Sequence, residues 1–172
     1  MGFCFQCGSE LIRSWMENRQ REVCPRCGWV HYPQLKVSAA AMVLEDNRLL
    51  LVKRATPPWQ GCWYLPAGYV EADEDPAHAA ERELLEETGL LACAGALHGA
   101  YFFDDDPRGN GLLLVYHMHL AGGSLNLNDE TDQAGFFEAD RLPSPLTGAG
   151  HDRAIAEWVA MTKTDRGLQK WN

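Results

Sequence analysis

Residues 68–90 fix one helix of this chain through the signals at its two ends. Asp75 and Pro76 form a strong helix start, because aspartate accepts a hydrogen bond from a free amide at the N-cap and proline fits the first helical position. Gly89 is a strong stop, since glycine readily adopts the left-handed conformation that ends many helices. We therefore expect a helix over residues 76–88.

This expected helix lies in an acidic segment. Residues 68–90 contain eight aspartates and glutamates, no lysine and one arginine, Arg82. Helical periodicity separates two sets of side chains: Ala77, Ala80, Leu84 and Thr88 toward the core, and Glu83, Glu86 and Glu87 within one neighbouring arc. Carboxylates three and four residues apart repel one another. One interpretation is a solvated acidic face on which Arg82 pairs with Glu86. The lack of interleaved lysine favours the other, a site for Mg²⁺ or Mn²⁺, which are hard ions that prefer carboxylate oxygens.

Two CxxC pairs, each followed by glycine, mark a separate N-terminal module. Their cysteines are Cys4, Cys7, Cys24 and Cys27. Two tight turns that each present two thiolates suit one tetrahedral Zn²⁺. The alternatives are disulfides, which are rare in the cytosol, or a redox pair, which would need only one copy. We expect the remaining cysteines, Cys62 and Cys93, to be small buried residues.

Charge divides the chain near the same place. Residues 1–36 contain five lysines and arginines against three acids, whereas the rest contains ten against twenty-one. Pro33 forces the preceding residue to be extended, so residues 31–34 are a natural joint. We expect a zinc ribbon over residues 1–33 and a larger domain over residues 34–172.

The overall charge limits the partners. A formal net charge of −9 opposes nucleic acid as the main partner and opposes anionic membranes. No apolar run has the length of a membrane span, and the N-terminus lacks the pattern of a signal peptide. We expect a cytoplasmic protein that does not bind a membrane.

Alternating apolar patterns predict the elements of the larger domain. Asp46 and Asn47 form a good hairpin turn between two strand-like runs. The predicted strands cover residues 35–45, 48–54, 92–103, 111–122 and 134–140, and apolar residues at helical spacing predict a last helix within residues 148–163. The sum is a mixed sheet flanked by helices.

Residues 68–90 carry a family resemblance. Gly68, Glu74 and the run from Arg82 to Leu90 match the Nudix signature, GX5EX7REUXEEXGU with U an aliphatic residue, at every defined position. The resemblance covers about residues 34–163. It implies an α/β fold, the Nudix α/β/α sandwich with a mixed β-sheet, here preceded by a small zinc-ribbon β module. It also implies Mg²⁺-dependent hydrolysis of a nucleoside diphosphate linked to another group, by attack of water on phosphorus.

The resemblance also implies roles for single residues. The magnesium ligands would be the carbonyl of Ala67 and the carboxylates of Glu83, Glu86, Glu87 and Glu130. The catalytic set would be Glu83, Glu86, Glu130 and Arg82. Arg82 would hold Glu74 or Glu86 in place. Glu130 would be a ligand or the general base, with Asp129 and Asp132 as alternatives, since Gln133 stands where relatives often have a second acid.

Two Nudix groups with an N-terminal zinc ribbon are similar to this chain. NADH pyrophosphatases carry an SQPWPFPxS array after the signature, and residues 97–111 lack it. The CxxCG pairs, the YP joint and the stretch LPAGYVE resemble the ADP-ribose and FAD group more closely. The implied reaction is hydrolysis of ADP-ribose or FAD to AMP and a phosphorylated product. NADH pyrophosphatase activity and a non-catalytic nucleotide sensor stay open as alternatives.

Such a small-molecule nucleotide needs an aromatic shelf and a basic contact for phosphate. The candidates are Trp59, Trp63, Tyr69 and Phe103 for the first and Arg54 for the second, each with a place in the core or on the surface as the alternative. Nudix enzymes for ADP-ribose and NADH are commonly dimers. With the apolar Phe3, Phe5 and Trp15 in the ribbon, this favours a homodimer.

Overall fold

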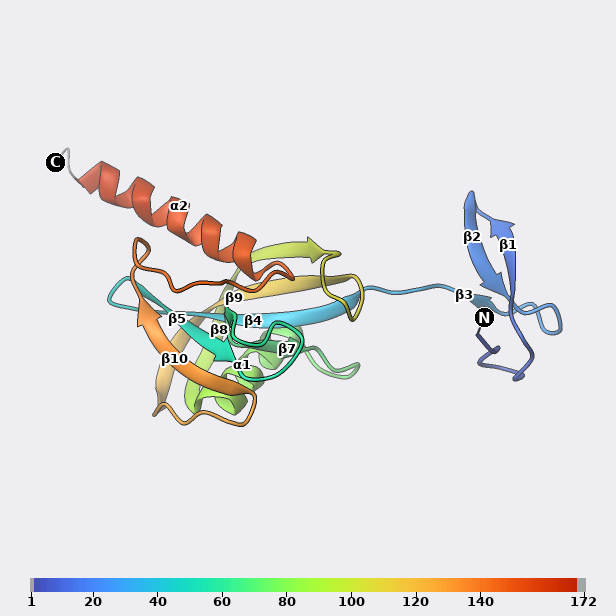
Figure 1. Cartoon of the computed structure of the whole chain (residues 1–172), viewed down its shortest axis with the longest axis horizontal. Coiled ribbons are helices and arrows are strands. Elements are labelled where there is room, and N and C mark those ends of the chain that lie inside the picture. The colour runs from blue at the N-terminus through green and yellow to red at the C-terminus, as the bar shows by residue number, and fades with distance from the viewer. Residues whose placement is uncertain (1, 170–172) are drawn as a thin grey trace. The chain divides into compact units, whose positions relative to one another are not determined.

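The computed structural model describes the backbone of residues 2–169 and the side chains of residues 2–164 (Figure 1). Contacts divide the chain after Gln34 into two compact units, and each is described by itself. No helix in the described part of the chain is long and apolar enough to cross a membrane.

The N-terminal unit is a small antiparallel sheet beside a cluster of cysteines. Its strands are β1 (Ile12–Met16), β2 (Arg19–Val23) and β3 (Val30–His31), in the order β1-β2-β3. Glu17 and Asn18 close the first hairpin with φ values of 50° and 61°, the left-handed conformation that both central residues of a type I′ turn adopt. Cys4, Leu11 and Cys24 form its buried core.

The larger unit is built on a mixed sheet. Its strands are β4 (Lys36–Glu45), β5 (Arg48–Arg54), β6 (Trp63–Tyr64), β7 (Ala67–Tyr69), β8 (Leu90–Phe103), β9 (Gly111–Gly123) and β10 (Thr131–Phe137). The order is β10-β5-β4-β9-β8, with β6 paired to β5 and β7 paired to β4. β4 and β9 run parallel and the other pairs are antiparallel, which confirms the predicted mixed sheet.

The first two strands of this sheet separate soon after their turn. Asp46 and Asn47 have φ values of 49° and 60°, as the predicted hairpin requires. β4 and β5 pair at Leu44↔Leu49 and Glu45↔Arg48, next to the turn. Farther along, β6 pairs with β5 and β7 pairs with β4, so residues 63–69 fill the gap between the two strands.

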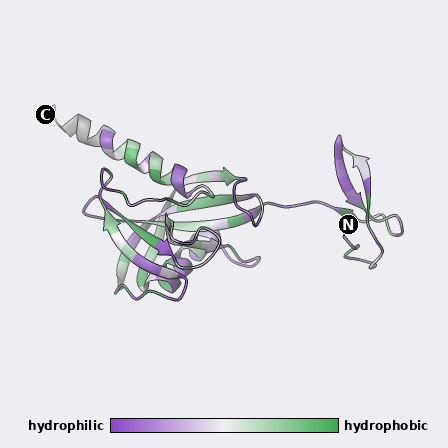
Figure 2. Cartoon of the chain, viewed as in Figure 1, coloured by the Kyte–Doolittle hydropathy of each residue, from purple (hydrophilic) through white to green (hydrophobic). Residues whose placement is uncertain are grey.

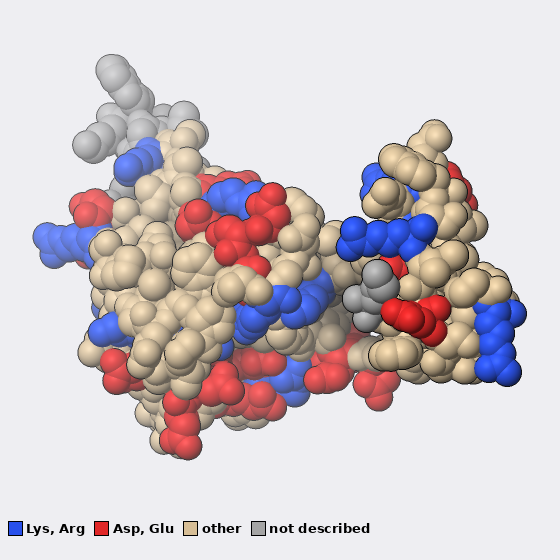
Figure 3. Space-filling model, turned by 45° about the vertical axis from the view of Figure 1, so that its right-hand side comes forward, with Lys and Arg blue, Asp and Glu red and all other residues tan. Residues whose placement is uncertain are grey.

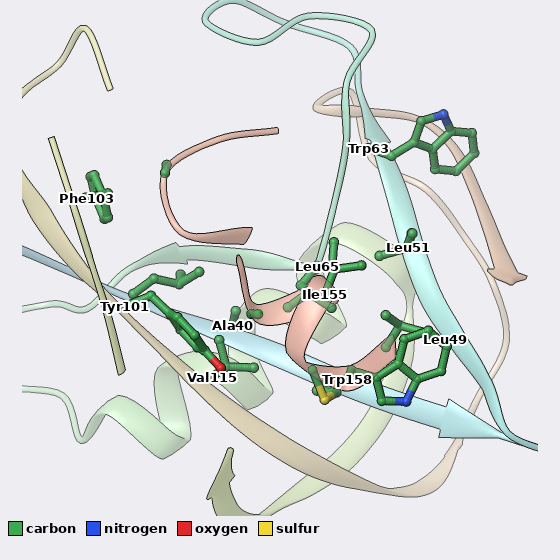
Figure 4. Close-up of a cluster of buried hydrophobic side chains, with 14 of the residues drawn as sticks. Ala40, Leu49, Leu51, Trp63, Leu65, Tyr101, Phe103, Val115, Ile155 and Trp158 are labelled. Atoms are coloured by element: carbon green, nitrogen blue, oxygen red, sulfur yellow. The ribbon is translucent and has the colours of Figure 1, made fainter. Parts of the chain in front are cut away.

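Two helices cover opposite faces of the sheet, α1 (Pro76–Thr88) and α2 (His151–Gln169) (Figure 1). Successive side chains of β4 point to opposite faces. Ala39, Ala41 and Val43 belong to the core that contains α1, whereas Ala40 and Met42 belong to the core that contains α2. Figure 2 shows the matching apolar strands, and Figure 4 shows the cluster on the α2 side, which includes residues of β5, β8, β9 and α2. The α/β/α sandwich is therefore confirmed.

Helix α1 has the predicted bounds and caps. The Asp75 side chain accepts a hydrogen bond of 2.8 Å from the amide of Ala77, and Gly89 ends the helix with a φ of 72°. Ala80, Leu84 and Thr88 are buried as predicted.

Several other expectations need correction. Ala77 is only half-buried, and Ala79 and Glu87 are buried in addition to the predicted core face. β10 begins at Thr131, three residues earlier than the predicted strand. Cys62 is half-buried and Cys93 is exposed, so the expectation that both are buried is wrong. Cys93 lies on β8, the edge strand of the sheet, where the burial pattern alternates and this position faces outward.

Candidate active site

A cavity of about 380 Å³ lies where β4 and β5 separate. Residues from the signature segment and from several loops line it. They include the acids Glu83, Glu86, Glu87 and Glu130, the aromatic residues Trp59, Tyr64, Tyr69 and Phe103, and the cations Arg54 and Arg108. The fold therefore brings residues 54, 83–87, 108 and 130 to one concave surface.

Glu87 is the most buried acid of this cavity, with 2% of its surface exposed. Tyr64 Oη donates to Glu87 Oε1 at 2.6 Å, and the amide of Ala67 donates to Glu87 Oε2 at 3.1 Å. Burial raises the pKa of Glu87 to about 8, although these two donors act in the opposite direction. A buried carboxylate of this kind is ionised more readily when a cation lies beside it.

Glu83 lies against the backbone of the signature loop. A Cβ on Gly68 would overlap the Glu83 carboxylate, so this position needs glycine. Burial raises the pKa of Glu83, and the charges of Glu86 and Glu130 add to the effect, whereas Arg82 opposes it. The acids are thus close enough to disfavour one another's charge.

Arg82 joins the acids of the helix to those of the preceding loop. Its Nε and Nη2 donate to the two carboxylate oxygens of Glu74 at 2.9 and 3.0 Å. Nη1 donates to Glu83 at 2.6 Å and to Glu86 at 3.2 Å. Nη2 also donates to the carbonyl of Tyr69 at 3.1 Å. A planar guanidinium can hold several oxygens in fixed directions at once, so Arg82 restrains both carboxylates of α1 that it touches.

Glu130 approaches the cavity from the loop before β10. Its amide donates to Asn128 Oδ1 at 2.9 Å, and its carbonyl accepts from the amide of Ala55 at 2.9 Å. These bonds tie the loop to the chain just beyond Arg54. The alternatives Asp129 and Asp132 are not among the residues that line the cavity, and Asp132 pairs with Lys53 at 3.8 Å.

The proposed aromatic shelf divides into two groups. Trp59, Tyr69 and Phe103 line the cavity. Trp63 does not line it, and it is buried in the core with its ring 5.0 Å from that of Phe137 (Figure 4). The reason is the strand alternation of β6, which turns Tyr64 toward the cavity and Trp63 away from it.

Several cavity residues were missing from the sequence prediction. Tyr64 lies in the stretch before the signature, but Tyr64 and Trp63 are both aromatic, so residue type alone does not tell which of them lines the cavity. The others include Ser38, Glu71, Asp106, Arg108, Leu113, Asn128, Thr147, Ala149 and His151. Arg108 is held by the nearly buried Asp106 at 2.7 Å. These residues reach the cavity only through the tertiary fold.

The helix carboxylates form an open set. Among the described residues, the acids of the cavity do not form a group whose ligand atoms all lie within 4.8 Å of one another. Mg²⁺ usually keeps several waters and takes one or two carboxylates together with substrate phosphates. The carboxylates that line the cavity offer the oxygen ligands that this metal takes.

The four ribbon cysteines form a closed set instead. Their sulfur atoms all lie within 4.8 Å of one another, with Cys4–Cys27 and Cys7–Cys24 separations of 3.5 Å. A tetrahedral Zn²⁺ with four thiolates at about 2.3 Å places its sulfurs about 3.8 Å apart. The cluster therefore has the size that a single zinc ion needs.

Known proteins resemble this chain along both units. Residues 34–159 match the family described as NUDIX domain, and residues 2–33 match the one described as Nudix N-terminal. An ADP-ribose pyrophosphatase from Methanocaldococcus jannaschii is 36% identical over 124 residues, which are 72% of each chain.

Two further similarities are to a longer protein and to a solved structure. An NAD-capped RNA hydrolase NudC from Stutzerimonas stutzeri is 32% identical over 83% of this chain, which spans 50% of that relative's length. The crystal structure of a NUDIX hydrolase from Nitrosomonas europaea superimposes with a TM-score of 0.80, at 28% identity, over 93% of this chain and 91% of that one.

Proposed function

Because the chain belongs to the Nudix family and is a pyrophosphohydrolase of that family, we propose that its substrate is ADP-ribose. FAD is the second candidate. The products would be AMP and a phosphorylated sugar or flavin. The main support for metal-dependent hydrolysis is that Glu83, Glu86, Glu87 and Glu130 line one cavity. The similarity to an ADP-ribose pyrophosphatase supports the choice of substrate.

The charge of the substrate explains the residue types. A pyrophosphate is anionic, and Figure 3 shows aspartate and glutamate side chains gathering in patches on the larger unit. Without a cation, the pyrophosphate and these carboxylates would repel each other. Bound Mg²⁺ or Mn²⁺ would neutralise the phosphate oxygens and lower the pKa of a water molecule. We assign its binding to Glu83, Glu86, Glu87, Glu130 and the Ala67 carbonyl.

Other residues prepare this site. Arg82 keeps Glu83 and Glu86 in place through its contacts of 2.6 and 3.2 Å. Tyr64 and the Ala67 amide fix the orientation of Glu87. Glu130 is the acid of its loop that lines the cavity, and it would serve either as a metal ligand or as the general base. Arg54 would contact a phosphate oxygen and oppose the charge that develops during attack.

In the N-terminal unit we propose one structural Zn²⁺ bound by Cys4, Cys7, Cys24 and Cys27. The separations of 3.5 Å between their sulfur atoms support this assignment. Four thiolates fill a tetrahedral ion and leave no position for water, so this metal would hold the fold of the ribbon rather than react.

The test is turnover of a substrate panel, namely ADP-ribose, FAD, NADH and diadenosine polyphosphates, with and without Mg²⁺. A coupled phosphatase exposes the terminal phosphates of the products. We expect phosphate release from ADP-ribose that depends on Mg²⁺. Turnover of NADH alone would instead support NADH pyrophosphatase activity, and the similarity to an NAD-capped RNA hydrolase is the reason to include this dinucleotide. No turnover of any compound would support a nucleotide sensor.

A further inference from the structure

One wall of the cavity carries polar atoms without partners. Arg54 Nε, Trp59 Nε1, Thr147 Oγ1 and His151 Nδ1 are buried and have no hydrogen-bond partner in the described protein. All four residues line the same cavity. Buried polar groups are nearly always paired, and leaving one unpaired is costly. Four such atoms on one wall therefore indicate that a ligand completes it.

Two of these residues are almost fully enclosed. Thr147 is 4% exposed and His151 is 7% exposed. The segment that carries them is fixed by its backbone, because Thr147 N donates to the Trp63 carbonyl at 2.9 Å and Ala149 N donates to the Asp105 carboxylate at 3.1 Å. The unpartnered atoms thus belong to a wall formed before a ligand arrives.

The chemistry of this wall suits hydroxyl groups. A threonine hydroxyl and a neutral imidazole nitrogen can each donate or accept a hydrogen bond, and an indole N–H donates. His151 is in its neutral form at neutral pH, because burial lowers its pKa to about 3. A sugar hydroxyl also donates and accepts, so it can pair with every atom of this set.

The wall lies on one side of the acids. Thr147 is joined to β6, which pairs with β5, whereas Tyr69 belongs to β7, which pairs with β4. Tyr69 offers an exposed ring, with Lys36 and Arg108 within 5.4 and 5.5 Å of its centre. The Arg108 guanidinium over this ring is planar, so it can stack on a flat base on that side.

Arg54 is the member of this wall that lies toward the acids, because it shares the Tyr64 ring with His151. Its guanidinium is 5.7 Å from the centre of the Tyr64 ring, and His151 packs edge-on against the same ring at 5.6 Å. Tyr64 itself donates to Glu87. A phosphate beside Arg54 would therefore place the group attached to it next to Thr147 and His151.

We propose that Trp59, Thr147 and His151 form the subsite for the hydroxylated sugar that is linked to the nucleoside diphosphate, and that they determine specificity for it. This inference rests on the proposed function. For ADP-ribose, the adenine would lie on the side of Tyr69, and the ribose attached to the second phosphate would lie on the side of Thr147.

The experiment compares two substrates in wild type and in Thr147→Val, which removes the hydroxyl at nearly constant volume. The substrates are ADP-ribose and the β-methyl ester of ADP, which lacks the second sugar. We expect the KM for ADP-ribose to rise about tenfold in Thr147→Val, with kcat within about twofold of wild type, since one hydrogen bond is lost. The KM for the methyl ester should not change. Thr147→Ser, which keeps the hydroxyl, should behave as wild type with both substrates.

The possible failures are distinct. If wild type hydrolyses neither compound, the proposed function is wrong, and the proposed subsite is then wrong as well. If wild type hydrolyses ADP-ribose and Thr147→Val leaves its KM unchanged, only the subsite is wrong. An equal rise in KM for both substrates also overturns it, because the hydroxyl would then contact the adenosine part. Trp59→Phe, which keeps a ring but loses the N–H, should repeat the selective effect.

Discussion

Tyr64 donates a hydrogen bond of 2.6 Å to Glu87, so a phenol from β6 holds the buried carboxylate near the end of α1. The same carboxylate accepts from the Ala67 amide at 3.1 Å. When a residue that orients a metal ligand in this way is removed, metal affinity or activity commonly falls by about 10- to 100-fold. In the proposed site, Tyr64 would therefore act by orienting Glu87.

Tyr64→Phe tests this relationship. The hydrogen bond from Tyr64 opposes the effect of burial on the pKa of Glu87. Without the phenol, this pKa should therefore rise further, and Glu87 should bind Mg²⁺ more weakly. We expect activity at limiting Mg²⁺ to fall about tenfold or more, with partial recovery at high Mg²⁺. The measurement is a Mg²⁺ titration of the initial rate.

Tyr101→Phe is the matched control for this variant. Tyr101 Oη also donates to a carboxylate, that of Glu157 on α2, at 2.7 Å, but neither residue lines the cavity. Its Mg²⁺ titration should match that of wild type. If the two variants behave alike, Tyr64 has no special relation to the metal.

Glu83→Gln tests the acids of α1. If Glu83 helps to bind Mg²⁺ against the pyrophosphate, kcat should fall by about hundredfold or more, while KM changes far less. The metal-free protein should become slightly more stable, because burial already raises the pKa of Glu83 and disfavours its charge. The measurements are kcat at saturating Mg²⁺ and the Tm in EDTA. Glu45→Gln, at an exposed acid that also pairs with an arginine, is the control. An unchanged kcat in Glu83→Gln would show that Glu83 takes no part in the chemistry.

Helix α1 could be predicted from sequence because its signals are local. Asp75, Pro76 and Gly89 act within one turn of the helix ends, and the structure places both ends as predicted. The burial of Glu87 could not be predicted in the same way. A helical projection places it beside Glu83 and Glu86, and only the packing of Tyr64 and Ala67 over α1 separates it from them.

The walls of the cavity were harder to predict. Trp63 and Tyr64 are adjacent aromatic residues, and sequence alone does not tell which one a two-residue strand turns toward the cavity. Thr147 and His151 come from a segment far along the chain, and no short-range pattern connects them to residues 68–90. Such residues become visible only when the sheet brings distant loops together.

Asp106 gives the larger unit a pH-dependent contribution to stability. Arg108 donates to its carboxylate and holds the pKa of Asp106 below its ordinary value of 3.8. A carboxyl whose pKa is lower in the folded state stabilises the fold above the unfolded pKa, and this contribution disappears as the pH falls through the folded pKa. Asp106→Asn should therefore lower the Tm by a few degrees at about pH 7, and the difference from wild type should shrink below about pH 4.

The check is thermal unfolding of both proteins across this pH range. Asp104→Asn, at an exposed acid in the same loop, should follow the wild-type curve. A difference between Asp106→Asn and wild type that stays constant down to about pH 2.5 would show that the ionic contact is not its source.

The homodimer remains a prediction, and the ribbon offers the surface for it. Phe3, Phe5 and Trp15 are 73%, 92% and 70% exposed. Exposed apolar surface can mark a protein–protein contact. We expect light scattering at micromolar concentration to give twice the mass of one chain. Phe5→Ser should shift the equilibrium toward the monomer, whereas Leu125→Ser, at an exposed leucine of the larger unit, should not. A monomer mass for the wild type would overturn the prediction.

The ribbon should hold one zinc ion per chain in protein purified without chelator, measured by elemental analysis. Cys24 is 1% exposed and lies in the small core with Cys4 and Leu11, so the metal and this core should form together. Cys24→Ser should lose the zinc and expose residues 2–33 to proteolysis, while kcat in the larger unit stays within about twofold, because no residue of the ribbon is assigned to the chemistry. Cys62→Ser, at a half-buried cysteine outside the cluster, should keep the zinc. Zinc-free wild type would rule out the zinc site, and a loss of kcat with an intact ribbon would show that its role is not structural.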